Sequence, residues 1–441
     1  MINAKIARRI RKSAFLLSLL ILIFAFGCGP APTSPIIIIP TSTLTPSPTT
    51  QTTETQIPTP SLSVTLTPFV PRGIIKIFSQ SPLSGDQAVF GKDILQGAEL
   101  AVLQLGGALS EQGYQIGLLR YDDGNNSDTA LSNAKTIVAD PEVLCGIGHY
   151  DSGITIQTSN IYHQAGLAFV APSATDALLT DRGYREVNRV IGRIDGQGVA
   201  GAQFAKDQGF SSAYVISSND ETALKNAEYF RREADRIGIQ VLGMVITNMS
   251  DDNVASIINH LLDGRPGLVY ISSTADKAIP FFHKARTAGY VGAFLGTEEL
   301  NNPPLFNFAD PSLVEGGGLY FTIITPPANY YPEAATFIQD FRTWYDAPPL
   351  LFAARAYDAT GICLKAIEEA SKAIGGEIPT RAQVATAIRA LKDYKGITGT
   401  YTFNLQGDPA LVQYYVYKVV AVGSANWDQN FIIASYHVPP P

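Results

Sequence analysis

Residues 146–175 read GIGHYDSGITIQTSNIYHQAGLAFVAPSAT and contain two strand-to-turn-to-helix units. In each unit an apolar, β-rich run stops at a small polar turn, DSGIT or PSAT, from which a helix can begin. The turns carry the hydroxyl side chains of Ser152, Thr155, Ser173 and Thr175. Free backbone N–H groups and the positive end of a helix dipole gather at such starts, so the turns suit a carboxylate. Ser and Thr are also common as plain helix caps, and this stretch alone favours capping.

Strand-like and helix-like segments alternate on both sides of this stretch, from about residue 74 onward. This alternation is typical of a parallel sheet with helices on both faces. After VNRVI, residues 187–191, the alternation begins again, which predicts a second α/β lobe. We expect helices over about 333–391 and a β-rich end. A chain of 441 residues also exceeds one ordinary core.

The first 72 residues belong to neither lobe. Residues 1–28 combine a positive head, an apolar run shorter than a membrane span, and Gly27-Cys28. This pattern resembles a bacterial lipoprotein signal peptide in which Cys28 becomes the lipid anchor, with ordinary secretion or an uncleaved anchor as alternatives. Residues 29–72 are rich in Pro, Thr and Ser and predict a disordered tether. We therefore expect an extracytoplasmic protein anchored to the bacterial cell membrane.

Net charge and cysteine content limit the expected partners and the expected redox state of the chain. The formal net charge is −7, and residues 1–28 hold five Lys or Arg and no acids, so the remainder carries −12. Nucleic acid is not an expected partner of so acidic a chain. Apart from Cys28, the cysteines are Cys145, in an apolar strand, and Cys363, on an apolar helix. We expect two buried thiols rather than a disulfide between such distant segments.

Several motifs point weakly to other chemistry. Residues 196–201 read GQGVAG, and Asp220 follows at the spacing of a dinucleotide-binding fold. An extracytoplasmic location argues against that cofactor, so a small-residue crossover is favoured over a secreted NAD-dependent oxidoreductase. The acidic turn at 122–128 lacks calcium-loop spacing, and no HExxH or GxSxG motif occurs. We expect no cofactor, no metal and no enzymatic activity, with a structural role for His149.

Glu298 and Glu299 follow the strand-like run GAFLG of the second lobe. In open α/β sheets, ligands bind in the crevice beyond the carboxyl ends of the strands. If one of these carboxylates faces the hydroxyl-bearing turns, the pair suits a zwitterion. An acidic pair at a strand end is, taken alone, more often a solvated turn.

Eight motifs occur in order between Ile74 and Tyr436: PLSG (82–85), GAELAV (97–102), YDDG (121–124), IGHYDSG (147–153), APSAT (171–175), RGY (182–184), LGTEEL (295–300) and AYDA (356–359). Together they resemble the leucine/isoleucine/valine-binding protein family of ABC-transporter solute receptors. The resemblance implies a type I periplasmic binding protein with two doubly wound α/β lobes joined by three crossovers. The expected lobes are 73–193 plus 325–407 and 194–324 plus 408–437. Such a protein is expected to be a monomer that closes on its ligand and delivers it to a membrane permease.

The resemblance also implies roles for individual residues. Ser152 and Thr175 would bind the ligand carboxylate with help from Ser173. The Ser173 carbonyl, Thr175 and Glu298 would bind the ammonium group. Phe90 and Phe352 would line the side-chain pocket.

The second lobe departs from the family pattern. Thr222 stands near an expected tyrosine, and Ser272-Ser273-Thr274 replaces a Gly-Gly-Tyr turn. Hydroxyl side chains, those of Thr222 and Thr274, would thus stand in the site where the family has two aromatic side chains. We therefore predict a larger or more polar amino acid, or an amine-bearing solute, rather than strict leucine selectivity. A ligand sensor, or a receptor for amides or urea-like solutes, is the alternative in the same structural class.

Overall fold

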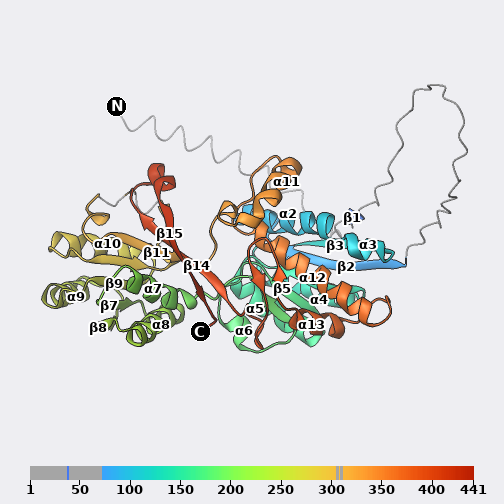
Figure 1. Cartoon of the computed structure of the whole chain (residues 1–441), viewed down its shortest axis with the longest axis horizontal. Coiled ribbons are helices and arrows are strands. Elements are labelled where there is room, and N and C mark those ends of the chain that lie inside the picture. The colour runs from blue at the N-terminus through green and yellow to red at the C-terminus, as the bar shows by residue number, and fades with distance from the viewer. Residues whose placement is uncertain (1–36, 39–71, 304–306, 308–310) are drawn as a thin grey trace, which may run out of the picture. The chain divides into compact units, whose positions relative to one another are not determined.

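The structure is a computed structural model, and it describes residues 37–38, 72–303, 307 and 311–441 (Figure 1). The predicted signal peptide over 1–28, with the proposed anchor Cys28, lies outside the described residues, as does most of the predicted tether over 29–72. Within that tether, however, Ile37–Ile38 forms strand β1, which pairs antiparallel with Gly117 and Leu118. As a whole, the tether over 29–72 stays a prediction.

The first sheet has six strands in the order β1, β3, β2, β4, β5, β6. The bounds of the last five are β2 Gly73–Ser81, β3 Tyr114–Asp122, β4 Val143–Gly148, β5 Ala168–Ala171 and β6 Val187–Arg189. Every pairing from β3 to β6 is parallel. The predicted parallel sheet is confirmed for this lobe.

Helices cover both faces of the first sheet. Successive residues of β2 point to opposite faces, and apolar side chains on each face need helices to bury them. Ile75 and Ile77 are fully buried against one set of helices, and Phe78 is fully buried against another. The first set is α2 Ala88–Leu105, α3 Gly107–Glu111, α12 Ala353–Ala373 and α13 Arg381–Ala390. The second is α4 Ser127–Ala139, α5 Ser152–Gln164 and the short α6 Leu178–Asp181. Helix α11, Ala335–Tyr345, packs on α2.

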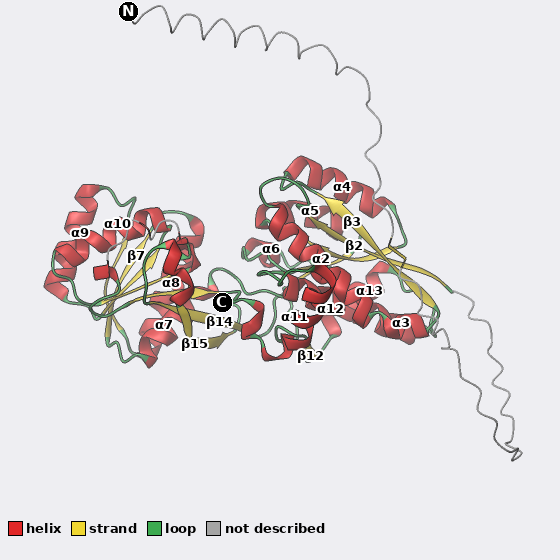
Figure 2. Cartoon of the chain, turned by 90° about the horizontal axis from the view of Figure 1, so that it is seen from above, coloured by secondary structure: helices red, strands yellow, loops and turns green. Residues whose placement is uncertain are grey.

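The second sheet has seven strands in the order β15, β14, β11, β10, β9, β7, β8. Figure 2 labels three of them, β7, β14 and β15. Their bounds are β7 Ser212–Ser217, β8 Gln240–Ile246, β9 Leu268–Ser272, β10 Ala293–Gly296, β11 Leu319–Ile323, β14 Val412–Val419 and β15 Phe431–Val438. The strands from β8 to β11 are parallel, whereas β14 and β15 run antiparallel at one edge. The helices are α7 Gly196–Asp207, α8 Glu221–Ile237, α9 Asp251–Gly264 and α10 Ala275–Thr287. Helices α7 and α8 cover one face, and α9 and α10 the other.

The chain passes between the two sheets three times, at residues 190–195, 324–334 and 402–411. The middle passage holds the 3-10 turns Ala328–Tyr330 and Pro332–Ala334. The last follows a hairpin of β12 Tyr394–Lys395 and β13 Thr400–Tyr401. The predicted α/β architecture of two wound lobes and three crossovers is confirmed, while the exact lobe boundaries remain a prediction. Among the described helices, none combines the length and apolar composition that a membrane span requires.

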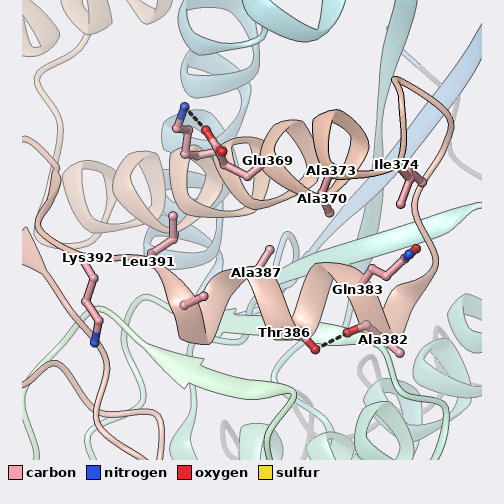
Figure 3. Close-up of a pocket in the computed structure, with 12 residues that line it drawn as sticks. Glu369, Ala370, Ala373, Ile374, Ala382, Gln383, Thr386, Ala387, Leu391 and Lys392 are labelled. Atoms are coloured by element: carbon pink, nitrogen blue, oxygen red, sulfur yellow. Dashed lines mark hydrogen bonds and ion pairs between the residues drawn. The ribbon is translucent and has the colours of Figure 1, made fainter.

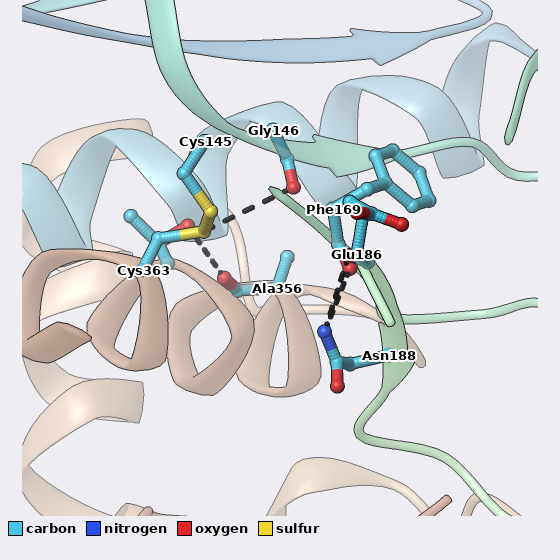
Figure 4. The surroundings of a disulfide bond; sticks show 8 residues. Cys145, Gly146, Phe169, Glu186, Asn188, Ala356 and Cys363 are labelled. Carbon is cyan, nitrogen blue, oxygen red and sulfur yellow. Dashed lines mark hydrogen bonds between the residues drawn. A yellow bond between two sulfur atoms is a disulfide. The ribbon is translucent and has the colours of Figure 1, made fainter. Parts of the chain in front are cut away.

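Cys145 and Cys363 are bonded to each other, with their Sγ atoms 1.97 Å apart (Figure 4). The prediction of two free buried thiols is therefore wrong. Cys145 lies in β4 and Cys363 in α12, and both side chains are fully buried. They are 218 residues apart in sequence, but α12 packs directly on β4 and brings their Cα atoms to 5.9 Å. The disulfide thus ties the centre of the first sheet to a helix from the late part of the chain.

Candidate ligand-binding site

The turns after β4 and β5 are hydrogen-bonded to each other. The Asp151 side chain caps α5 by accepting from the Ile154 N–H at 2.9 Å, so Ser152 does not serve as the cap. Instead, the Ser152 hydroxyl oxygen accepts from the backbone N–H of Thr175 at 3.2 Å and of Asp176 at 3.5 Å. Parallel neighbouring strands end at the same sheet edge, which explains why these turns meet. The plain-cap interpretation therefore does not hold for Ser152.

Ser173 and Thr175 use their hydroxyl groups differently. The buried Ser173 hydroxyl donates to the carbonyl oxygens of His149 at 2.5 Å and Tyr150 at 3.1 Å. It is thus occupied in holding the first turn. The half-buried Thr175 hydroxyl has no partner in the part of the chain that the structure describes. The Thr175 hydroxyl, the O–H of Ser152, which only accepts in the bonds above, and the N-terminal end of α5 are therefore available to an anion among the described residues.

His149 lies beneath the first turn with no exposed surface. Its Nδ1 is 2.8 Å from the Asp123 carboxylate, and its Nε2 is 2.9 Å from the Thr158 hydroxyl. Both ring nitrogens therefore have protein partners, which agrees with the predicted structural role. The bond from Ser173 to the His149 carbonyl carries this support to the second turn.

Three aromatic rings gather beside the turns. Phe90 and Tyr150 are stacked with ring centroids 5.1 Å apart, and Phe352 meets them edge-on at 6.1 and 5.8 Å. All three side chains are half-buried. The structure thus brings the predicted Phe90 and Phe352 together and adds Tyr150, which the sequence reasoning missed. Its position inside the motif IGHYDSG, two residues before Ser152, was the available signal.

A buried carboxylate fixes the position of Phe352. Asp93 on α2 is 2% exposed, and it accepts from the backbone N–H groups of Leu350, Phe352 and Ala353, each at 2.8 Å. Burial raises the pKa of Asp93, and these three N–H donors oppose that rise. The start of α12, and with it one wall of the aromatic group, is therefore held by α2.

Glu298 begins a 3-10 turn, Glu298–Leu300, directly after β10. Its Oε2 accepts from the Ile324 N–H at 3.3 Å, and its own N–H donates to Gln197 at 2.9 Å. In the described part of the chain no cation pairs with this half-buried carboxylate. Burial raises the pKa of Glu298 to about 7. The neighbouring Glu299 is more exposed than Glu298, and partial desolvation of its carboxyl, together with the Asp220 charge, raises its pKa. Glu298 is therefore the acid whose charge a ligand ammonium would stabilise.

Thr222 and Thr274 differ in their surroundings. Thr222, half-buried in the first turn of α8, lines a cavity of about 190 Å³ that also touches Asp176, next to Thr175. Thr274 is exposed at the start of α10 and makes no capping hydrogen bond. Hydrogen bonds join Ser152 to Thr175, but in the described residues none joins them to Glu298, Thr222 or Thr274. That Glu298, Thr222 and Thr274 of the second lobe bind the ligand therefore stays a prediction.

Two larger hollows lie elsewhere. A groove of about 590 Å³ runs between α12 and α13, and five of its twelve lining residues are alanines, with Glu369 and Lys392 among the polar ones (Figure 3). A cavity of about 830 Å³ lies at the crossovers, where Tyr331, Tyr401 and Tyr415 are among its walls. Neither contains a residue predicted to bind ligand.

The glycines of residues 196–201 have a packing role. A Cβ on Gly198 would lie 2.1 Å from the Asn226 carbonyl oxygen on α8, and one on Gly196 would lie 2.2 Å from the Tyr414 hydroxyl. These close approaches favour the small-residue crossover over a dinucleotide site. Among the described residues, no group of three or more His, Cys, Asp or Glu could hold a metal ion.

Comparisons with known proteins agree with this architecture. Residues 75–424 match the family model described as periplasmic binding protein. A Leu/Ile/Val-binding protein homolog from Brucella suis biovar 1 is 26% identical over 341 residues, which cover 76% of this chain and 88% of that protein. A leucine-, isoleucine-, valine-, threonine- and alanine-binding protein from Pseudomonas aeruginosa is 26% identical over 78% of this chain and 89% of its own length.

Solved structures show the same fold. A putative branched-chain amino acid ABC transporter protein from Rhodospirillum rubrum superposes with a TM-score of 0.65 at 25% identity, covering 79% of this chain and 99% of that one. A solute-binding protein from R. palustris, solved with benzoate, gives a TM-score of 0.56 at 19% identity over 82% of this chain and 96% of its own. With a family model that spans most of its length, this chain belongs to the periplasmic binding protein family.

Proposed function

We propose that this chain is the extracytoplasmic solute-binding protein of an ABC importer, and that its ligand is an α-amino acid or a related amine-bearing solute. The observation that carries the proposal is the pair of joined turns at Ser152 and Thr175. Among the described residues they leave the Thr175 hydroxyl without a hydrogen-bond partner beside the start of α5, as a carboxylate site requires. The amino-acid-binding relatives support the same ligand class.

The mechanism needs no covalent step. The ligand carboxylate binds the Thr175 hydroxyl and the N–H groups at the start of α5, while its ammonium group reaches Glu298. Its side chain lies against Phe90, Tyr150 and Phe352. Each hydrogen bond to a charged group contributes about 1.5–3 kcal/mol, which favours the closed form of the two lobes. Closure then presents the loaded receptor to the permease.

A lipid anchor at Cys28 would keep the receptor at the membrane. The basic head, apolar run and Gly27-Cys28 of the sequence support this part of the proposal. Metabolic labelling with a fatty acid should mark the protein, and the Cys28→Ala variant should lose both the label and the membrane association. Labelling that persists in the variant contradicts the proposed anchor.

The test of the ligand class is a thermal-shift screen of the chain without residues 1–28. The panel holds the common amino acids, polyamines, short amides and urea, and calorimetry measures each hit. At about 100 times Kd, a ligand should stabilise the fold by roughly 2.7 kcal/mol. A hit among the amino acids or amines supports the proposal. Hits confined to amides or urea would favour the alternative receptor, and no hit with a cooperative melt would contradict an amino-acid ligand.

A further inference from the structure

Arg355 lies in the first turn of α12, is 4% exposed, and reaches two of the three crossovers. Its Nη1 donates to the Val190 carbonyl at 2.5 Å, in the first crossover. Its Nη2 donates to the Ile324 carbonyl at 3.2 Å and to the Tyr331 hydroxyl at 3.0 Å, both in the second crossover. All three acceptors are neutral oxygens, two backbone carbonyls and one hydroxyl, and in the described residues no hydrogen bond joins this buried guanidinium to an acid.

Each of these crossovers also bonds a residue of the proposed ligand site. In the first crossover, the Ile194 N–H donates to the Thr175 carbonyl at 2.9 Å. In the second, the Ile324 N–H donates to the Glu298 carboxylate at 3.3 Å. Arg355 holds the carbonyl of that same Ile324. A continuous set of hydrogen bonds therefore runs from Glu298 through Ile324 and Arg355 to the first crossover.

The acid nearest to Arg355 in sequence is already engaged. Asp358, one turn further along α12, accepts from the N–H groups of Ile397 and Thr398 at 2.7 and 2.8 Å and from the Thr398 hydroxyl at 2.5 Å. Tyr401, from the same segment, donates to the Val190 carbonyl at 3.3 Å, beside Arg355. The start of α12 is thus tied to the hairpin before the third crossover as well as to the first two.

We propose that Arg355 is a positioning residue for ligand binding, which fixes the two crossovers relative to each other and so places Glu298 and Thr175 for one ligand. This inference rests on the proposed function and deepens it. A guanidinium suits the role because its planar fork directs several N–H groups at fixed angles, whereas a lysine ammonium is a flexible point charge. Arg355→Lys therefore keeps the positive charge and removes the planar fork of N–H donors.

Arg381 provides a matched control. Arg381 is half-buried, and its guanidinium donates to three backbone carbonyls, those of Val143, Val138 and Asp140, all of which lie in the first lobe. Arg381→Lys removes the same kind of fork without touching a crossover. If Arg355 only supports the fold, the two lysine variants should behave alike.

The experiment measures two quantities in the full chain with each variant. The first is calorimetric affinity for an amino acid that binds the unmodified protein. The second, which needs no ligand, is the distribution of distances between spin labels on Thr136→Cys in α4 and Asn259→Cys in α9, both exposed. Arg355→Lys should weaken binding at least tenfold and broaden the distance distribution, while Arg381→Lys should change neither by more than about twofold.

The outcomes separate the two proposals. If the unmodified chain binds no amino acid, the proposed function fails, and the distance distribution alone decides the role of Arg355. An unchanged distribution in Arg355→Lys, or affinity equal to that of Arg381→Lys, overturns the inference. Should Arg355→Lys not fold, Tyr331→Phe carries the test, since it removes one acceptor of Arg355 and keeps the ring. A broader distribution than that of the parent is then expected, and no change would overturn the inference.

Discussion

The backbone N–H of Thr175 donates to the Ser152 hydroxyl oxygen at 3.2 Å, which joins the turns after β4 and β5. This bond gives the two predicted ligand residues different tasks. Ser152 accepts this bond and so holds the second turn in place, whereas the Thr175 hydroxyl has no hydrogen-bond partner in the described part of the chain. Variants at the two positions should therefore differ in whether they affect the fold or the ligand.

Replacing Thr175 by Val should weaken ligand binding with little change in stability. Valine keeps the shape of the side chain and the backbone N–H that Ser152 accepts, and it removes only the free hydroxyl. Loss of one hydrogen bond to a charged carboxylate costs about 1.5–3 kcal/mol, or a 10- to 150-fold rise in Kd. Calorimetry with a ligand from the screen measures it.

Thr343→Val is the control for this variant, because Thr343 is exposed on α11 and, within the described residues, its hydroxyl bonds only the Gln339 carbonyl. It should leave Kd unchanged. Equal affinity in Thr175→Val and the parent would remove Thr175 from the site.

The Glu298→Gln variant should be more stable than the parent at high pH. Burial raises the pKa of Glu298 to about 7 in the folded chain, above the value of an unfolded glutamate. The contribution of Glu298 to stability is therefore complete below about pH 4.3 and is lost as the pH rises through 7. Glutamine does not ionise, so the melting-temperature difference should grow from pH 5 to pH 8.5, by the equivalent of about 1–3 kcal/mol. A difference independent of pH would contradict the raised pKa.

Ligand binding should show the opposite pH preference. An ammonium ligand needs the ionised carboxylate, so affinity should rise about tenfold between pH 5.5 and pH 8 as Glu298 loses its proton. Binding should also release a proton near pH 7, which calorimetry in buffers of different ionisation enthalpy can detect. In Glu298→Gln the pH dependence should disappear, and a retained dependence would assign it to another group.

Much of this arrangement follows from sequence pattern. Parallel strands end at one edge of a sheet, which is consistent with two turns that share a ligand, and the sequence shows directly that these turns carry Ser152 and Thr175. The alternation of strand and helix likewise predicts the two lobes. Side-chain direction is harder to predict, since nothing in the order HYDSG shows that Tyr150 stacks on Phe90 of α2. The exposure of Thr274 depends on loop geometry that the spacing of residues does not fix.

The pairing of Cys145 with Cys363 could not be predicted for a related reason. A strand and a helix 218 residues apart meet only because α12 returns to the first lobe after the chain has built most of the second. Hydrophobic pattern predicts that each cysteine is buried, and both are. Chain topology decides which buried residues come into contact. A single sequence reveals that topology only when it resembles a family of known fold.

Removing the disulfide should destabilise the first lobe. The bond closes a long loop, and loss of such a cross-link typically costs about 2–5 kcal/mol. The double variant Cys145→Ala, Cys363→Ala should therefore melt several degrees lower. Because both cysteines are fully buried, reductant alone should leave the folded parent unchanged, and it should act only together with denaturant. Equal stability of parent and double variant would show that the bond adds nothing to the fold.

The aromatic group should determine which ligand side chains are accepted. Tyr150 is stacked on Phe90 and meets Phe352 edge-on, so Tyr150→Ala opens space between two rings that otherwise enclose it. Burial of apolar surface stabilises by about 25 cal/mol per Å², so small aliphatic ligands should bind less tightly and bulky ones should lose less. Tyr150→Phe keeps the ring and, because the Tyr150 hydroxyl has no partner in the described chain, should bind as the parent does. The ratio of affinities for a small and a bulky ligand, measured by calorimetry, reports the effect. A ratio unchanged in Tyr150→Ala would place the ligand side chain away from these three rings.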